Sequence, residues 1–258
     1  MSDPLAGRRV IVTRAASQAA ALVELLVGAG AEVLVFPTIE IVDPEDFEPV
    51  DEAIRHLDVY SWAIFTSANA VTRFFARMAL ADKDARHLHG LRVAAVGPAT
   101  AAALERNGIR ADFVPDEYVG EGVLDGLCAR GVGAGTRVLI PRALEAREVL
   151  PEELAAHGAR VDVVPVYRAV PGEGDPDVLT RIVAGEADAV TFTSSSTVRN
   201  FVRLTGGVDV SGLVVAVIGP VTASTARELG LRVSVEPSEY TVPALVGALG
   251  EHFSRPGA

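Results

Sequence analysis

Short apolar runs rich in Val, Ile and Ala alternate with longer amphipathic stretches along the whole chain. The apolar runs do not alternate strictly with polar residues, a pattern typical of strands that are buried on both faces of a parallel sheet. The pattern predicts strands, with helices between them, at residues 9–13, 32–36, 62–66, 92–96, 111–114, 137–140, 160–164, 188–193, 214–218 and 232–235. Gly30, Gly108, Gly158 and Gly230 each follow a predicted helix, where glycine permits the left-handed turn that closes it.

The chain also contains one series of fragments twice. VIVTR at 10–14 returns as VLIPR at 138–142, and FTS at 65–67 returns at 192–194. GPAT at 97–100 returns as GPVT at 219–222, and Tyr118 returns as Tyr240 with the same spacing. A repeat of this length indicates two similar domains. Five strands alternating with helices in each copy predict an α/β fold, with two flavodoxin-like doubly wound parallel-sheet domains.

Composition agrees with a folded protein of two domains. The chain has 258 residues, of which 49% are hydrophobic and 22% charged, enough for two cores of about 125 residues each. The net charge is −11 and no basic cluster occurs, which argues against a nucleic acid as partner. An anionic ligand would therefore have to be held by local donors rather than by the overall field.

Two further features bear on the compartment. No apolar stretch approaches the length of a membrane span, and the first residues lack the pattern of a secretory signal. The single cysteine, Cys128, excludes a disulfide within the chain. We expect a cytoplasmic protein with no membrane partner.

Polar turns follow four predicted strands, where ligands of parallel sheets bind. They are TSAN at 66–69, GPAT at 97–100, TSSS at 193–196 and GPVT at 219–222. Each has the serine, threonine or proline that begins a helix, so each is also explained by ordinary capping. Four such turns in two domains favour paired surfaces that bind carboxylates or phosphates through backbone amides.

The usual catalytic signatures are missing from the sequence. GAG at 28–30 and GEG at 120–122 do not follow the first strand of a βαβ unit, so neither predicts a dinucleotide site. No Walker loop, metal-ligand spacing or nucleophile elbow occurs. We therefore expect no cofactor and no metal, and any reaction must need little from side chains.

The chain resembles the uroporphyrinogen-III synthase family over almost its whole length. The matching segments are VTR at 12–14, FTSANAV at 65–71, AVGPAT at 95–100, PVYR at 165–168, FTS at 192–194 and VIGPVT at 217–222. The resemblance implies a substrate with eight carboxylates, the linear tetrapyrrole hydroxymethylbilane. The family closes it with loss of water and inversion of ring D, through an azafulvene and a proposed spiro intermediate. Since the bilane also closes unaided without inversion, the enzyme's main task would be positioning.

The resemblance also implies a crossed chain path. The repeat alone would divide the chain near residue 130, whereas the family's path gives domain 1 as residues 1–38 with 168–258 and domain 2 as residues 39–167. Two linker segments near 36–42 and 165–170 would form a two-stranded connection, with the ligand cleft between the domains. The sequence alone leaves both paths open.

Tyr167 is the catalytic candidate, because it matches a tyrosine that the family places in the cleft and its phenol could donate a proton to the departing hydroxyl. An ordinary linker tyrosine is the alternative. Arg14 follows the first strand and could clamp a carboxylate, and it ranks above Arg142, which lacks the preceding threonine. The other expected substrate-binding residues lie at the helix starts: Thr66, Ser67, Ala68, Ala99, Thr100, Ser194, Ser195, Val221 and Thr222.

Two other functions remain open from the residues alone. A non-catalytic binder of an anionic metabolite would use the same helix starts, and a sugar-nucleotide transferase would also place its ligand between two such domains. The expected partner is the small-molecule tetrapyrrole, with a hand-over from the enzyme that makes it. We expect a monomer.

Overall fold

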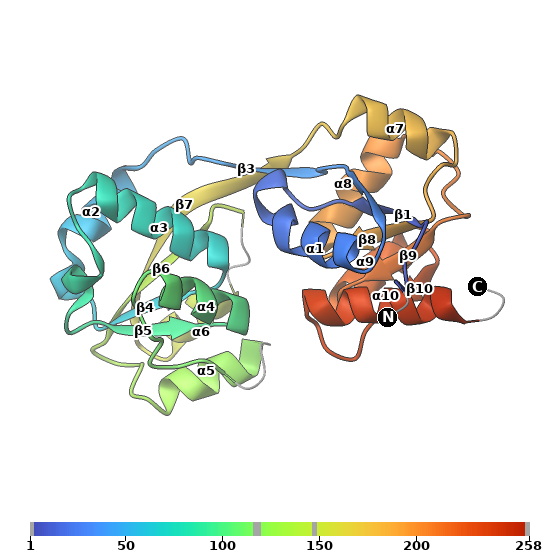
Figure 1. Ribbon diagram of the computed structural model, residues 1–258. Coiled ribbons are helices and arrows are strands. Elements are labelled where there is room, and N and C mark those ends of the chain that lie inside the picture. Colours follow the sequence, from blue (N-terminus) through green and yellow to red (C-terminus); the bar gives the residue numbers. More distant parts are fainter. Residues whose placement is uncertain (1–2, 116–119, 146–148, 256–258) are drawn as a thin grey trace. The chain divides into compact units, whose positions relative to one another are not determined.

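The computed structural model describes residues 3–115, 120–145 and 149–255. The chain divides into two compact units, unit 1 with residues Met1–Ile41 and Val170–Ala258 and unit 2 with Val42–Ala169. Each unit is a parallel sheet flanked by helices (Figure 1). The chain begins in unit 1, crosses to build unit 2 and returns.

The described residues form these elements. The strands are β1 (Arg9–Val12), β2 (Glu32–Val35), β3 (Ile39–Val42), β4 (Trp62–Phe65), β5 (Arg92–Ala95), β6 (Arg137–Ala143), β7 (Arg160–Pro171), β8 (Ala189–Phe192), β9 (Val214–Val217) and β10 (Val233–Val235). The α-helices are α1 (Ala16–Gly28), α2 (Glu48–Arg55), α3 (Ala68–Leu80), α4 (Pro98–Arg106), α5 (Gly120–Cys128), α6 (Val149–Ala156), α7 (Pro176–Val183), α8 (Ser195–Thr205), α9 (Pro220–Glu228) and α10 (Val242–Ser254). Two 3₁₀ turns, η1 (Leu57–Val59) and η2 (Ala85–Leu88), lie in unit 2.

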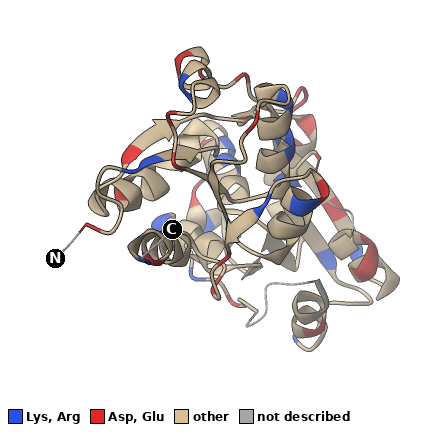
Figure 2. Ribbon diagram, turned by 90° about the vertical axis from the view of Figure 1, so that its right-hand side faces the viewer, with Lys and Arg blue, Asp and Glu red and all other residues tan. Residues whose placement is uncertain are grey.

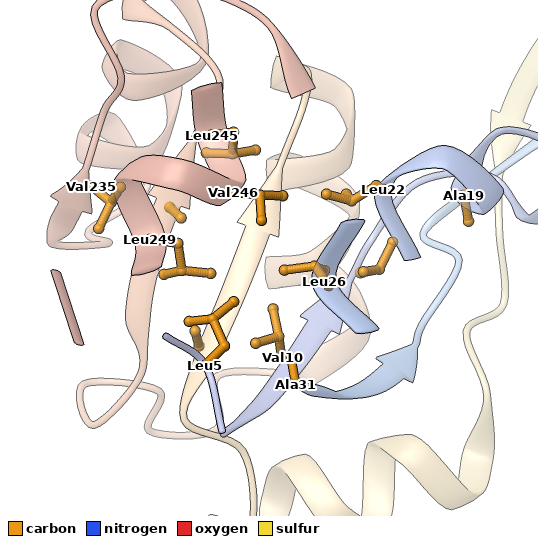
Figure 3. Packing of buried hydrophobic residues seen from close by; sticks show 13 residues of the cluster. Leu5, Val10, Ala19, Leu22, Leu26, Ala31, Val235, Leu245, Val246 and Leu249 are labelled. Carbon is orange, nitrogen blue, oxygen red and sulfur yellow. The ribbon is translucent and has the colours of Figure 1, made fainter. Parts of the chain in front are cut away.

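Unit 1 has the strand order β10-β9-β8-β1-β2, the flavodoxin-like order, and its strands pair in parallel. Val10 and Val12 of β1 pack with α1 and α10 on one face, where Leu22, Leu26, Leu245 and Leu249 are buried (Figure 3). Ile11 points to the other face, among residues of α7, α8 and α9. Burial of alternate residues on opposite faces explains why β1 has an unbroken apolar sequence.

Unit 2 repeats this arrangement with a different chain path, in the order β3-β7-β6-β4-β5. Trp62 and Ile64 of β4 pack on one face with Leu127 of α5 and Leu154 of α6. On the other face Phe65 meets the ring of Phe74 in α3 edge to face. The prediction of two flavodoxin-like α/β domains is confirmed.

The glycines predicted to end helices adopt left-handed backbone conformations in both copies of the repeat. Gly30 has a φ of 91° and Gly158 a φ of 86°, both in the left-handed region. A Cβ at Gly30 would approach the backbone of Ala6 to 3.2 Å, and one at Gly158 would approach that of Ala134 to the same distance. The two equivalent positions thus require glycine for the same reasons.

One predicted strand is wrong and two are too short. Residues 111–114 contribute only a single parallel bridge between Phe113 and Ala94, because the Asp112 side chain takes the Val93 amide at 2.7 Å in place of a strand carbonyl. Strands β6 and β7 run on past residues 140 and 164, so that Tyr167 pairs with Ala143 inside the sheet. The linker prediction anticipated strands here, and β3 does bond to β7.

Charged residues are scattered over the helices, with Lys and Arg interspersed among Asp and Glu (Figure 2). The ion pairs follow the same pattern, such as Arg137 with Asp162 at 2.8 Å and Arg181 with Glu32 at 2.6 Å. No helix in the described ranges is both long and apolar enough to cross a membrane.

Candidate active site

The carboxyl edge of the unit 1 sheet gathers most of the predicted residues of that unit. Since the strands are parallel, their carboxyl ends meet at one edge. The segments that follow β10, β9, β8 and β1 therefore lie along this edge in that order. Val221 and Thr222 follow β9, Ser194 and Ser195 follow β8, and Arg14 follows β1. The strand order reverses between β8 and β1, which is where doubly wound sheets bind ligands.

Arg14 lies at this reversal with an incompletely satisfied guanidinium. Its Nη2 donates to Gln18 Oε1 at a long 3.4 Å, while its Nε is buried and has no hydrogen-bond partner among the described residues. Desolvation by burial lowers the pKa of Arg14 below its usual range. A bound carboxylate would supply the missing acceptor and favour the charged form.

Helices α8 and α9 begin side by side, and their side chains lock the two starts together. Ser195 Oγ donates to the Val221 carbonyl at 3.3 Å and accepts from Thr225 Oγ1 at 2.8 Å. Ser194 Oγ caps α8 by accepting from the Thr197 amide at 3.3 Å. With the Ser195 hydroxyl proton used inside the unit, Ser195 can offer a ligand chiefly its backbone amide.

The carboxyl edge of unit 2 brings Tyr167 and Ser67 into direct contact. The Tyr167 hydroxyl lies 3.2 Å from Ser67 Oγ, within hydrogen-bonding distance, although 100 residues separate them in sequence. Ser67 Oγ also accepts from the Ala70 amide at 3.2 Å as the cap of α3. Tyr167 is only 8% exposed, so its phenol is held by packing as well as by this bond.

The remaining predicted residues of unit 2 flank this pair. Thr66 is exposed after β4, and Ala68 is the first residue of α3. Ala99 is exposed and Thr100 buried in the first turn of α4, which follows the neighbouring strand β5. Thr222 is likewise buried in the first turn of α9. No hydrogen bond reaches the Thr100 or Thr222 hydroxyl from within the described ranges.

Arg142 differs from its counterpart Arg14. Arg142 lies inside strand β6 and is 2% exposed, and its Nε lies 3.4 Å from the Ala143 carbonyl. A buried arginine with partners of its own stabilises the sheet edge, and it is less available to a ligand.

Helix starts supply the remaining donors at each edge. The first amides of α3, α4, α8 and α9 have no acceptor within their own helices, and the helix dipole adds partial positive charge there. Both edges therefore suit carboxylate groups. The part of the chain that is described contains no group of three or more His, Cys, Asp or Glu side chains that could hold a metal ion.

Comparison with known proteins decides the family. The model of the family described as uroporphyrinogen-III synthase HemD matches residues 20–247. A uroporphyrinogen-III synthase of Synechococcus elongatus is 38% identical over 98% of both chains. The chain belongs to the uroporphyrinogen-III synthase family.

Solved structures of the uroporphyrinogen-III synthase family share this fold. One from the extremely thermophilic bacterium Thermus thermophilus aligns with a TM-score of 0.65 at 18% identity, over 97% of this chain and all of that one. One from Helicobacter pylori aligns with a TM-score of 0.61 at 19% identity, over 93% and 97%.

In this family member one residue of the edge, Thr225, could not be found from the sequence motifs, and Ser196 was found only as part of the turn at 193–196. Thr225 holds Ser195, and Ser196 Oγ lies 3.0 Å from Ser194 Oγ. The i to i+4 spacing of Val221 and Thr225 on one helix was the available signal, since Thr225 Oγ1 also lies within hydrogen-bonding distance of the Val221 carbonyl, at 3.2 Å. Recognising it required knowing that α8 and α9 are neighbours.

Proposed function

We propose that this enzyme converts hydroxymethylbilane to uroporphyrinogen III, as a hydro-lyase that closes the ring with inversion of ring D. The match to the family at 38% identity over nearly the full length carries this proposal. Two kinds of donor support it. The helix-start amides and Arg14 suit carboxylates, whereas the Tyr167 phenol could donate a proton.

The eight carboxylates would be held mainly by backbone amides. The first turns of α3 and α4 in unit 2, and of α8 and α9 in unit 1, each present amides that need acceptors. We propose that both units hold the same bilane. Positioning of this kind favours one ring closure over the spontaneous one without strong acid or base chemistry.

Tyr167 would assist loss of the hydroxyl. In our proposal Ser67 Oγ donates to Tyr167 Oη, which leaves the phenol proton free to point at the substrate hydroxyl. The carbon–oxygen bond breaks as the phenol proton reaches the leaving oxygen, and water departs. The pyrrole nitrogen supplies the electron pair and gives its own proton back to the Tyr167 phenolate, which restores the phenol and leaves a neutral azafulvene for attack by ring D.

Three further parts of the proposal concern the protein's setting. We propose that it works as a monomer in the cytoplasm and receives bilane from the enzyme that makes it. A hand-over would limit the time in which free bilane closes without inversion.

Isomer analysis tests the proposal directly. The purified chain should convert freshly made hydroxymethylbilane to the type III isomer with no added cofactor and in the presence of EDTA. Product that remains type I, as in a blank without protein, would overturn it.

A further inference from the structure

Among the described residues, Tyr240 is the only Phe, Tyr or Trp side chain that is largely exposed, at 61%. It follows β10 and therefore stands at the carboxyl edge of the unit 1 sheet, next to the start of α9. Val221, in the first turn of α9, is also 58% exposed. The edge that presents amides and Arg14 thus also presents apolar surface.

The Tyr240 ring rests against Gly219, the residue that caps α9. A Cβ built on Gly219 would lie 2.9 Å from Cδ1 of the ring, closer than real Cβ atoms come, and a tight 3.1 Å from Cγ. The φ of Gly219 is 176°, an extended value open to any residue. Glycine is needed here for the space that the ring occupies, and that contact fixes one side of the ring.

The backbone on either side of the ring is also held. Thr241 donates its amide to the Glu239 carbonyl at 2.8 Å, and its side chain caps α10 by accepting from the Ala244 amide. Helix α10 is anchored in the core through Leu245 and Leu249 (Figure 3). No hydrogen bond engages the Tyr240 hydroxyl within the described ranges. The ring is thus held in place and yet open to solvent, without a polar role inside the unit.

The internal repeat retains the same pair of residues. Gly97 and Tyr118 have the same spacing as Gly219 and Tyr240, although most residues between them differ. Tyr118 lies outside the described residues, so the geometry comes from the second copy alone. Retention of glycine and tyrosine in both copies is unexpected for an exposed ring that only fills space.

We propose that the exposed face of Tyr240 stacks on a pyrrole ring of the tetrapyrrole substrate. The inference rests on the proposed function and adds a contact for the rings to those for the carboxylates. A linear tetrapyrrole has flat rings as well as carboxylates, and offset stacking on an aromatic face is favourable. Tyr240 is a binding residue in this proposal, and it takes no part in proton transfer.

Steady-state kinetics of three variants test it. Tyr240→Ala should raise KM for hydroxymethylbilane by about 3- to 10-fold with little change in kcat, the range expected for one stacked pair. Tyr240→Phe keeps the ring and should recover most of the lost affinity. Leu80→Ala removes an exposed side chain at the far end of α3 and serves as the control for surface substitution, with unchanged KM.

Failure of this inference is distinguishable from failure of the function. If the wild-type chain yields no type III isomer, the proposed function falls. If the wild type is active and Tyr240→Ala keeps its KM within twofold, the stacking contact is wrong. If Tyr240→Phe is as impaired as Tyr240→Ala, the hydroxyl and not the ring makes the contact. Binding of uroporphyrin III, followed by its fluorescence, should weaken in the same order.

Discussion

The two units share one sheet order and one set of helix starts, but their edges have diverged. Among the described residues of unit 1, the arginine at the strand reversal, Arg14, has a buried Nε without a partner, and the Ser194 hydroxyl bonds only within its own helix. In unit 2 the equivalent Arg142 is buried in the strand, and Ser67 bonds to Tyr167. The comparison suggests that unit 1 supplies a charged anchor and unit 2 a proton donor, while both supply amides.

The feature that the units share should be the easiest to break. Ala99→Asp in unit 2 and Val221→Asp in unit 1 each place a carboxylate at an exposed first-turn position. The added charge competes for the amides and repels the octa-anion, so kcat/KM should fall at least about 100-fold. The melting temperature should hold or rise, because a helix start gains about 0.3 to 1 kcal/mol from a negative charge.

Leu80→Asp is the matched control, since it adds the same charge at the exposed C-terminal end of α3. It should leave kcat/KM near the wild-type value. If both edge variants keep their activity and stability, the helix starts are ordinary caps. If only one loses activity, a single unit holds the carboxylates.

The proposed proton donor, Tyr167, distinguishes unit 2. Tyr167→Phe keeps the ring and removes the phenol, so kcat should fall by roughly 10- to 100-fold, the range for loss of one acid. Ser67→Ala should lower kcat less, because it removes only the bond that orients Tyr167. The equivalent change in unit 1, Ser194→Ala, removes a cap and should alter the melting temperature more than kcat.

Turnover of single variants on fresh bilane, with the melting temperature of each, separates these outcomes. Unchanged kcat in Tyr167→Phe would leave Tyr167 as a structural residue of β7.

The two arginines should respond in opposite ways. Arg14→Gln removes a guanidinium whose Nε has no partner in the described part of the chain, so the melting temperature should hold or rise while KM increases about tenfold, the effect of one charge-assisted bond. Arg142→Gln removes a buried group and should lower the melting temperature with little effect on KM. Similar effects of the two variants on both quantities would show that the arginines have not diverged in role.

Much of this architecture could be predicted from the sequence, for definite reasons. The apolar runs located strands such as β1 and β4 to within a residue, because strands buried on both faces leave little ambiguity. The strand predicted at residues 111–114 failed because a side chain, Asp112, replaced a backbone partner. Strand propensity does not show when a side chain will take the place of a backbone hydrogen-bond partner.

The sequence predicted individual residues of the candidate site better than the contacts between them. Helix starts such as Ser67 and Ser194 are visible as capping motifs, and both do cap. The bond from Ser67 to Tyr167 joins residues far apart in sequence, and the partnership of Ser195 with Thr225 depends on which helices are neighbours. The proposed role of Tyr167 and the crossed chain path came from the family resemblance and not from the residue pattern.

The smallest expected effect concerns a difference at the start of β4. Tyr60 is buried in unit 2 beside Asp162 and under Arg137, whose guanidinium carbon lies 5.1 Å from the ring centre, whereas the equivalent position in unit 1 is Ala187. Burial, followed by the Asp162 carboxylate, raises the pKa of Tyr60 to about 12. In the unfolded chain a tyrosine ionises near pH 10, so the native state retains its proton over a higher range.

Between pH 10 and about 12 the unfolded state therefore binds fewer protons than the native state, and the free energy of unfolding must fall as pH rises. One group can contribute a slope of at most about 1.4 kcal/mol per pH unit. Urea unfolding followed by the fluorescence of Trp62, the single tryptophan and a residue of unit 2, measures it. Tyr60→Phe removes the titrating group and should flatten the slope in this range. An equal slope in the variant would assign the alkaline loss of stability to groups other than Tyr60.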